Sequence, residues 1–293
     1  MGRIAEPVRG AGIVRSIAVI NQKGGTGKTT TVGNLGAALA MRGKRVLMID
    51  FDPQGALSIW FDVTHPRSLY DLMEGGAETR KCIYKVRENL ALIPGDKRLG
   101  RIREGIGAMW GGEIEERLMR SAGPYHFLLM DCPPSWSLMS RYALMIAREV
   151  YMPVSMEYLS MIGIRQVVEG VRDLVDEWGH APEIKLVIPT FYDRRQKKSR
   201  EIMKLLQWHF GIRVTEPIRS NVRLSEAISY HQSIFEYAPE SHGAKDYEKL
   251  VRRVEDVQGT QSHGERPARG YSGPAGGPGE QNEIFKGRGG SPR

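Results

Sequence analysis

The chain has 293 residues, of which 41% are hydrophobic and 26% charged, so it can bury a large core and is neither a fibre nor disordered throughout. Its formal net charge of +8 favours a polyanionic partner, either nucleic acid or an acidic membrane surface. No apolar run reaches the roughly 18 to 20 residues that a membrane-spanning helix needs, which excludes a transmembrane protein of that kind.

The amino-terminal residues 1–12 are polar and contain glycine, and we expect them to form a flexible tail. They lack the uninterrupted apolar core of a secretory signal, which predicts a cytoplasmic protein. The two cysteines, Cys82 and Cys132, lie far apart without C-x-x-C spacing. We therefore interpret them as buried or idle thiols in a reducing compartment.

Compact apolar runs alternate with longer helical patterns over residues 13–258. This alternation is typical of an α/β domain with a single doubly wound, mostly parallel sheet that has helices on both faces. Strands are expected at residues 16–20, 45–49, 90–93, 127–130, 149–153 and 185–188.

Two later helices are predicted from their apolar stripes. Residues 158–178 have a stripe that we interpret as packing on the sheet, and residues 244–257 have a more modest one that is also suited to docking on the sheet. Residues 259–293 are rich in Gly, Pro, Ser and Gln and are predicted to be a disordered tail. The first stripe consists of Leu159, Ile162, Val167, Val171, Leu174 and Val175, and the second of Tyr247, Leu250, Val251 and Val254.

The strongest motif is K-G-G-T-G-K-T-T at residues 23–30, between the first predicted strand and a helical run over residues 32–41. Its glycines let backbone N–H groups converge on phosphate oxygens, and the helix directs its positive end at the same charge. The motif predicts a P-loop NTPase that binds ATP and Mg²⁺. The candidate ATP-binding residues are Lys23, Gly24, Gly25, Thr26, Gly27, Lys28, Thr29 and Thr30.

Within this loop, Lys28 is predicted to bridge the β- and γ-phosphates and Thr29 to bind Mg²⁺, with Thr30 nearer the α-phosphate. Two carboxylates, Asp52 and Asp131, follow apolar runs at predicted strand ends, where open α/β sheets place their ligand sites. Asp50 lies two residues before Asp52 and is expected to point to the same face as a helper. Phosphoryl transfer to water needs mostly positioning and charge neutralisation, so no separate nucleophilic side chain is required.

An ordinary P-loop needs no second lysine, yet Lys23 stands five residues before Lys28. In this respect the loop resembles the deviant Walker A ATPases, which include ParA, MinD and the nitrogenase iron protein. Further blocks, from about Arg15 to Val254, resemble the ParA/Soj family, most closely its members without an amino-terminal operator-binding domain. These blocks are D-F-D-P-Q-G, D-C-P-P-S, P-V-S-M-E-Y, Y-D-R-R and N-V-R-L-S-E-A.

The resemblance implies a homodimer with ATP between the subunits, in which Lys23 reaches the partner's nucleotide. It makes Lys23, Lys28 and Asp52 the catalytic residues, with Asp52 acting on the attacking water. It also implies that Asp131 holds Mg²⁺ through water and that Asp52 is a second candidate for such a contact. The expected activity is slow hydrolysis of ATP to ADP and phosphate, stimulated by a ParB-like partner.

Related partition ATPases carry arginines for sequence-nonspecific DNA binding at the positions of Arg195 and Arg223, and Lys197 and Lys198 enlarge the first patch. Contacts of this kind to phosphates would be sensitive to salt. The resemblance therefore implies a nucleoid-associated protein that segregates chromosome or plasmid DNA, without stable membrane association. The other interpretation is that these residues form the basic, solvent-exposed start of a helix and have no role in DNA binding.

Three rival functions stay open at this point. A MinD-like membrane cycle would need a basic amphipathic helix at the extreme carboxyl terminus, which the sequence lacks. An iron-protein-like reductase would need cysteines in cluster-binding loops, and neither cysteine has that context. A ParA-like protein could also position a protein cargo on the nucleoid. Departures from the family pattern at Ala56, I-R-S-N (218–221) and A-I-S-Y-H (227–231) leave the adenine contacts and the adaptor undetermined.

Overall fold

The structure, a computed structural model, describes residues 14–74, 76–102, 116–118, 125–180 and 182–261. The chain divides into two compact units, residues 1–254 and 255–293. The predicted amino-terminal tail lies outside the described residues, as does nearly all of the predicted carboxyl-terminal tail. All strands of the sheet belong to the first unit.

A seven-stranded sheet in the order β3-β4-β2-β5-β1-β6-β7 forms the centre of this unit. Every neighbouring pair is parallel except β3 with β4, which confirms the predicted doubly wound, mostly parallel sheet. The strands are β1 (Arg15–Val19), β2 (Val46–Asp50), β3 (Tyr84–Arg87), β4 (Leu90–Ile93), β5 (Phe127–Asp131), β6 (Glu149–Ser155) and β7 (Glu183–Thr190).

Helices cover both faces of the sheet because the central strands are apolar on both sides. In β2, Leu47 and Ile49 join one buried cluster while Val46 and Met48 join the other, as the alternation of side chains along a strand requires. One layer contains α1 (Lys28–Met41), α2 (Ala56–Trp60), α8 (Val222–Ser229), α9 (Ile234–Tyr237) and α10 (His242–Gln261). The other contains α3 (Leu69–Met73), α5 (Leu138–Ile146), α6 (Leu159–Trp178) and α7 (Lys197–Phe210).

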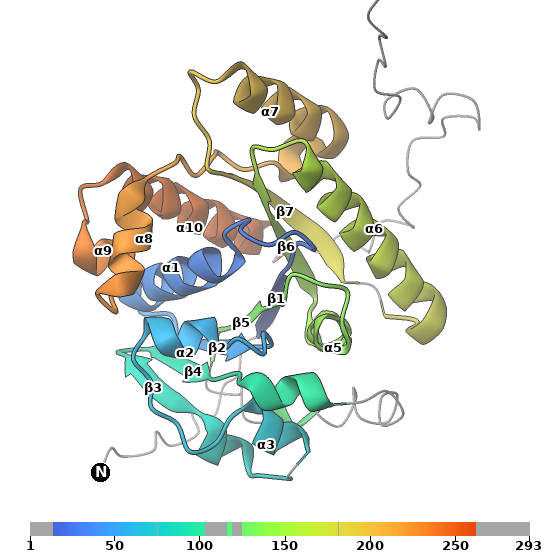
Figure 1. The fold of residues 1–293 in the computed structure, drawn as a ribbon, viewed down its shortest axis with the longest axis vertical. Coiled ribbons are helices and arrows are strands. Elements are labelled where there is room, and N and C mark those ends of the chain that lie inside the picture. Colours follow the sequence, from blue (N-terminus) through green and yellow to red (C-terminus); the bar gives the residue numbers. More distant parts are fainter. Residues whose placement is uncertain (1–13, 75, 103–115, 119–124, 181, 262–293) are drawn as a thin grey trace, which may run out of the picture. The chain divides into compact units, whose positions relative to one another are not determined.

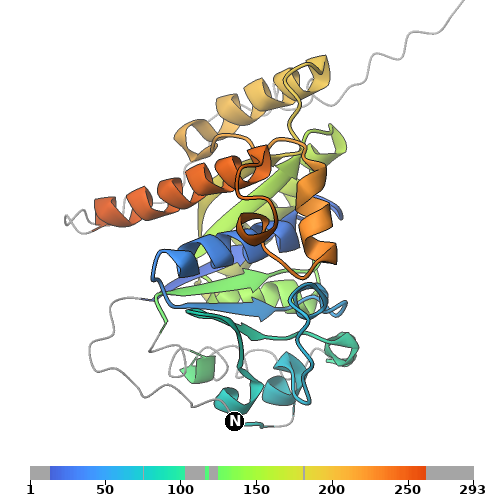
Figure 2. The same ribbon diagram turned by 90° about the vertical axis from the view of Figure 1, so that its left-hand side faces the viewer.

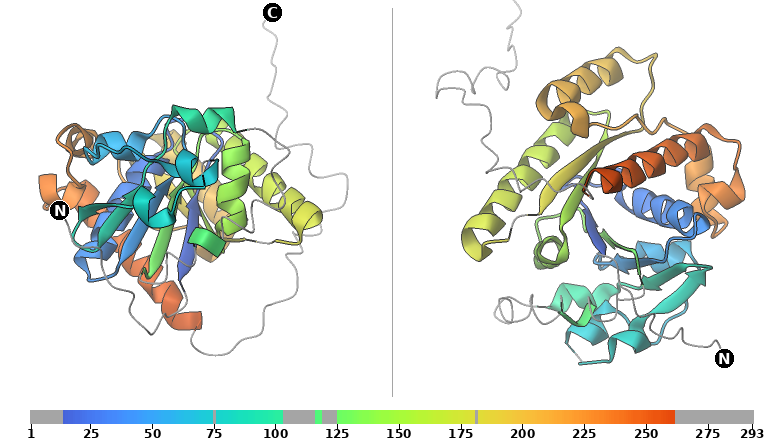
Figure 3. Two further views of the ribbon diagram at one scale, coloured as in Figure 1. Left: turned by 90° about the horizontal axis from the view of Figure 1, so that it is seen from below. Right: turned by 180° about the vertical axis from the view of Figure 1, so that it is seen from behind.

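The figures show these two layers from several sides. In Figure 1, α1 and α10 lie on one side of the sheet and α5 and α6 on the other. Figure 2 looks onto the α1 and α10 layer, and the rear view in Figure 3 shows α6 across the sheet from α10. The strand ends that precede α1 and α6 are therefore close to each other, on neighbouring strands β1 and β6.

All six predicted strands are present, but the sequence analysis missed β3. This short edge strand is polar and contains a register shift between Lys85 and Arg87, so it has no regular apolar pattern. Its stabilisation comes from distant parts of the chain, since Arg87 pairs with Glu236 at 2.7 Å and lies over the ring of Phe61. Such contacts leave no local signal in the sequence.

Three helical predictions need correction. Helix α1 begins at Lys28 and not near residue 32, because Gly27 adopts a left-handed conformation that starts the helix there. Helix α10 continues to Gln261, three residues into the predicted tail. In α6, Val167, Val171 and Leu174 are buried as predicted, whereas three members of the stripe are exposed and do not pack on the sheet: Leu159, Ile162 and Val175.

Candidate active site

The loop between β1 and α1 is shaped by glycines in left-handed conformations. Gly25 has φ 70° and Gly27 has φ 87°, values that side-chain-bearing residues rarely adopt. Gly27 is the N-cap of α1, and no side chain caps the helix. The amide groups of the first turn, beginning at Lys28, are therefore available to an anion, which is the arrangement that a phosphate-binding loop requires.

Lys28 lies under this loop and is only 7% exposed. Its ammonium group donates a hydrogen bond to the carbonyl of Lys23 at 3.1 Å. Burial lowers the pKa of Lys28, while the charges of Asp131 and Asp52 act in the opposite direction. A buried ammonium group beside the uncapped start of a helix can bind a polyphosphate directly.

Asp131 ends β5 directly beside the first turn of α1. The Thr29 hydroxyl donates to its Oδ2 at 2.6 Å, and its buried Oδ1 has no hydrogen-bond partner among the described residues. Burial raises the pKa of Asp131 to about 7, although Thr29 and Lys28 oppose the shift. A hydroxyl and an unsatisfied carboxylate oxygen beside a phosphate loop fit Mg²⁺, and Thr29 and Asp131 are the residues that would hold it.

The two aspartates after β2 have different environments. β2 ends at Asp50, and Asp52 lies two residues beyond the carboxyl end of the strand, in the turn that leads to α2. The predicted helper Asp50 is fully buried and accepts from the amides of Asp52 at 2.9 Å and Leu57 at 3.1 Å. Burial and the neighbouring Asp131 raise its pKa. Asp50 thus organises the turn that carries Asp52.

Two glycines that the sequence analysis did not single out allow this turn to form. A Cβ on Gly95 would lie 2.6 Å from the carbonyl oxygen of Asp50 and 2.8 Å from that of Asp52. Gly55, with φ 63°, would in turn place a Cβ 2.7 Å from the carbonyl oxygen of Gly95. The end of β4 and the Asp52 turn therefore approach backbone to backbone, which only glycine permits.

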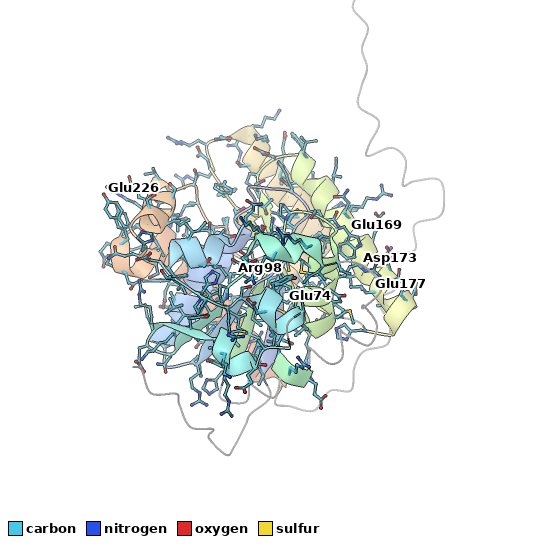
Figure 4. All side chains as sticks on the ribbon, turned by 60° about the horizontal axis from the view of Figure 1, so that its bottom comes forward. Glu74, Arg98, Glu169, Asp173, Glu177 and Glu226 are labelled. Carbon is cyan, nitrogen blue, oxygen red and sulfur yellow. The ribbon has the colours of Figure 1, made fainter. Side chains whose placement is uncertain are left out.

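The segment after Gly95 is held by a group of charged side chains. Arg98 pairs with Asp96 at 2.7 Å and with Asp71 at 2.6 Å, and its place is marked in Figure 4. Burial alone would raise the pKa of Asp96, but hydrogen bonds from Arg98 and Ser68 lower it to about 2. These contacts keep the Gly95 backbone against the Asp52 turn.

Lys23 lies at the start of the loop, and its ammonium group pairs with Glu157. It also approaches the Ser160 hydroxyl at 3.4 Å. The charge of Lys23 and its hydrogen bond lower the pKa of Glu157. Glu157 precedes α6, and the sequence analysis did not identify it as a partner of Lys23 because the two residues are 134 positions apart.

Comparisons with known proteins agree with this geometry. The model of the AAA domain family matches residues 14–185. The chromosome partitioning protein ParA of Caulobacter vibrioides is 36% identical over 250 residues, which cover 82% of this chain and 94% of the relative. The chain belongs to the ParA/Soj family of partition ATPases.

Two further relatives place the ParA/Soj chain among nucleotide-binding proteins. The chromosome-partitioning ATPase Soj of Treponema pallidum is 34% identical over 244 residues, covering 82% of this chain and 96% of Soj. Cobyrinic acid a,c-diamide synthase of Mycobacterium smegmatis, solved with ADP and magnesium, has a TM-score of 0.71 and 26% identity. That match covers 85% of this chain and 97% of the synthase. ATP hydrolysis and binding of a nucleotide with Mg²⁺ are thus family properties.

The structure places the candidate DNA-binding residues of the ParA/Soj chain in two regions. Arg195 and Lys198 line a cleft of about 730 Å³ beside the β7–α7 connection, together with Glu157 and Arg219. Lys197 is exposed at the first turn of α7, 3.6 Å from Glu201. Arg223 is exposed on α8, where it pairs with Glu226, marked in Figure 4, and it does not line this cleft. The structure therefore brings Arg195 and Lys198 together and leaves Arg223 on a separate helix.

Arg195 is not an unpaired cation, because it forms two 3.1 Å hydrogen bonds to Asp193. Arg195 lowers the pKa of Asp193 to about 2. A nucleic-acid phosphate would therefore have to displace the Asp193 carboxylate from Arg195 or bind next to its negative charge. The role of these basic residues in DNA binding stays a prediction.

The remaining structural details bear on the rival functions. Both cysteines are buried, Cys82 at the end of a short 3₁₀ turn and Cys132 directly after β5, whereas a cluster shared between subunits needs accessible thiols.

The α10 stripe of Tyr247, Leu250, Val251 and Val254 is buried against the sheet layer, as predicted. Within the described ranges, no helix has the length and apolar character to cross a bilayer. The segment that a MinD-like anchor would occupy lies outside those ranges.

Proposed function

We propose that this ParA/Soj chain is a Mg-dependent ATP hydrolase that dimerises around ATP, binds DNA without sequence specificity as the dimer, and segregates chromosome or plasmid DNA. A ParB-like adaptor is expected to stimulate hydrolysis, and the dimer is expected on the nucleoid. The proposal depends mainly on one observation. Lys23 lies at the edge of the phosphate loop, beside an exposed apolar surface that is suited to contact with a second subunit.

That apolar surface comes from two segments that contact the loop. On the β6–α6 side, Tyr158 is 53% exposed, Leu159 66% and Ile162 46%. On the β7 side, Phe191 is 51% exposed, and its ring would lie 3.9 Å from a Cβ on Gly27. Apolar side chains gathered around a charged site are typical of an interface that becomes buried on association.

The electrostatics of association favour a lysine at this place. Two subunits that face each other across their nucleotides bring two polyphosphates together, and the repulsion between them requires additional cations. Lys28 is buried under its own loop, whereas Lys23 lies at the edge of the loop and its ammonium group contacts Glu157 and Ser160, at the start of α6. Lys23 can therefore exchange Glu157 for a phosphate of the partner's nucleotide.

The test is the association of Lys23→Ala measured by size-exclusion chromatography with light scattering in Mg-ATP. We expect the variant to bind ATP but to stay monomeric, while Lys28→Ala loses nucleotide binding. Lys85→Ala is the matched control, because Lys85 is an exposed, ion-paired lysine on the edge strand. Normal ATP-driven association of Lys23→Ala would contradict the proposal.

A further inference from the structure

Asn21 lies between the phosphate loop and two neighbouring elements. Its side chain is fully buried, and its Nδ2 donates to the carbonyl of Pro153 in β6 at 2.8 Å. Its Oδ1 accepts from the backbone amide of Lys23 at 3.0 Å. A carbonyl only accepts and a backbone amide only donates, so the two partners determine the orientation of the Asn21 amide.

This contact differs from the two that reach the carbonyl of Lys23, both of which come from residues of the phosphate loop. The Thr26 hydroxyl donates to that carbonyl at 3.4 Å. The carbonyl of Lys23 accepts from Lys28, whose ammonium group is the one expected to turn to phosphate when nucleotide binds. The contact from Asn21 involves no group that is needed for the nucleotide. It can therefore hold the start of the loop in both the empty and the loaded protein.

The fifth residue of α6, Gly163, makes room for this arrangement. A Cβ at Gly163 would lie 2.2 Å from Oδ1 of Asn21 and 3.4 Å from the backbone nitrogen of Lys23. A methyl group there would push away the oxygen that accepts from Lys23. α6 also carries Leu159 and Ile162, so the helix that presents the apolar surface is in direct contact with the group that sets the position of Lys23.

We propose that Asn21 and Gly163 are positioning residues for Lys23. Asn21 fixes the backbone of Lys23 relative to β6 and α6, and Gly163 provides the space that this hydrogen bond needs. The inference rests on the proposed role of Lys23 in ATP-driven dimerisation. It predicts that disturbing either residue weakens association while the protomer still binds nucleotide.

The experiment compares Gly163→Ala, Asn21→Ala and the double variant with Lys23→Ala. Association in Mg-ATP is measured by light scattering over a range of protein concentrations, and ADP affinity by calorimetry. We expect each single variant to need about tenfold more protein for half-maximal association, which is about 1.4 kcal/mol per dimer, or about 0.7 kcal/mol for the hydrogen bond lost in each protomer. The ADP affinity should change by less than about threefold, because no nucleotide contact is removed.

The double variant distinguishes positioning from general damage to α6. Asn21→Ala removes the oxygen with which the new methyl group collides, so the double variant should associate like Asn21→Ala alone. Gly170→Ala is the control in the same helix, because its Cβ would collide with the ring of Trp136. Gly170→Ala should lower thermal stability but leave unchanged the concentration of folded protein that gives half-maximal association.

Association of Gly163→Ala at the wild-type concentration would overturn the inference, and so would additive losses in the double variant. If Gly163→Ala does not fold, Asn21→Ala decides the question, and wild-type association of that variant overturns the inference. Failure of the proposed function would look different, since Lys23→Ala would then dimerise normally.

Discussion

Asp50 and Asp131 end two adjacent strands and Asp52 lies two residues beyond the first of them, yet each has a different environment. Asp131 is buried beside Thr29 with one oxygen unpartnered, which suits a metal contact. Asp50 uses both oxygens to accept backbone amides. Asp52 alone of the three is partly exposed, with one oxygen accepting from the Gln54 amide at 2.9 Å. Of the three, only Asp52 can approach a water molecule that attacks phosphate.

Asp52→Ala should therefore abolish turnover without abolishing nucleotide binding. We expect phosphate release in Mg-ATP to fall at least about 100-fold, the usual contribution of a positioned acid or base. ATP should then persist, and the dimer should accumulate on size-exclusion chromatography. Asp173→Ala, on the outer face of α6 (Figure 4), should leave the rate unchanged. Wild-type turnover of Asp52→Ala would remove this residue from the mechanism.

Gly95→Ala should act through Asp52, because the three atoms nearest to a Cβ at Gly95 belong to Asp50 and Asp52. The added methyl group would meet the backbone oxygens of Asp50 and Asp52 and displace the turn. We expect hydrolysis to fall about 10- to 100-fold with ADP affinity nearly unchanged, since a small misplacement of a catalytic group costs that much. Gly100→Ala is the matched control, because among the described residues no atom beyond its two chain neighbours lies within 4 Å of a Cβ there. Equal effects in both variants would contradict this account.

Among the elements, β1, β6 and α10 are joined by one buried charge network. Arg15 pairs with Glu149 at 2.6 Å, with both side chains 6% exposed, and donates to the Tyr151 hydroxyl at 2.9 Å. Its remaining nitrogen donates to the carbonyl of Val254 at 2.7 Å. The network thus joins the strand that leads into the phosphate loop to the strand that precedes Glu157.

Arg15→Ala should destabilise the protein more than any exposed charge substitution. Removing the guanidinium group leaves Glu149 buried without a cation, which costs about 3–5 kcal/mol of unfolding free energy. Arg165→Ala, which breaks an exposed pair within α6, should cost less than about 0.5 kcal/mol. Urea unfolding of both variants checks the difference, and similar losses would show that the network contributes little.

At the scale of the whole molecule, the proposed function implies that ATP controls DNA affinity by controlling dimerisation. A protomer presents one set of basic residues around the β7–α7 connection and α8, and a dimer presents two sets on one particle. Linking two weak sites raises the overall affinity without any new contact, provided that both engage the same duplex. The net charge of +8 per chain adds a general attraction to nucleic acid.

Arg195→Ala combined with Arg223→Ala should weaken DNA binding without affecting association. Each phosphate contact contributes roughly 0.9 to the slope of log affinity against log salt, so loss of two per protomer should reduce the slope for the dimer by about 4. Lys81→Ala with Lys85→Ala removes the same charge from exposed positions elsewhere. An equal loss of affinity in this control would show that net charge, and not these arginines, determines binding.

The predictable part of the fold comes from strands that are buried on both faces. Each of the six strands that have a parallel neighbour, edge strand β7 included, contains a buried apolar run that packs against helices. Edge strand β3 has one neighbour and a polar sequence, so its pattern resembles a loop. The exposed half of the α6 stripe could not be predicted for a similar reason. The spacing of apolar residues predicts which face of a helix is apolar, but it does not tell which part of that face the rest of the protein covers.

The phosphate loop could be read from the sequence by itself because its residues are consecutive, and chain connectivity alone places Lys23, Lys28 and Thr29 around one turn. Lys23 with Glu157, Gly95 with Asp50, and Gly163 with Asn21 were decided only by the tertiary structure. In each pair the two residues come from different elements, and their contact depends on how strands and helices pack. Some positions require glycine because a side chain would collide with a distant element, and some carboxylates pair with a lysine far away in the sequence. Neither requirement produces a recognisable spacing of residues along the chain.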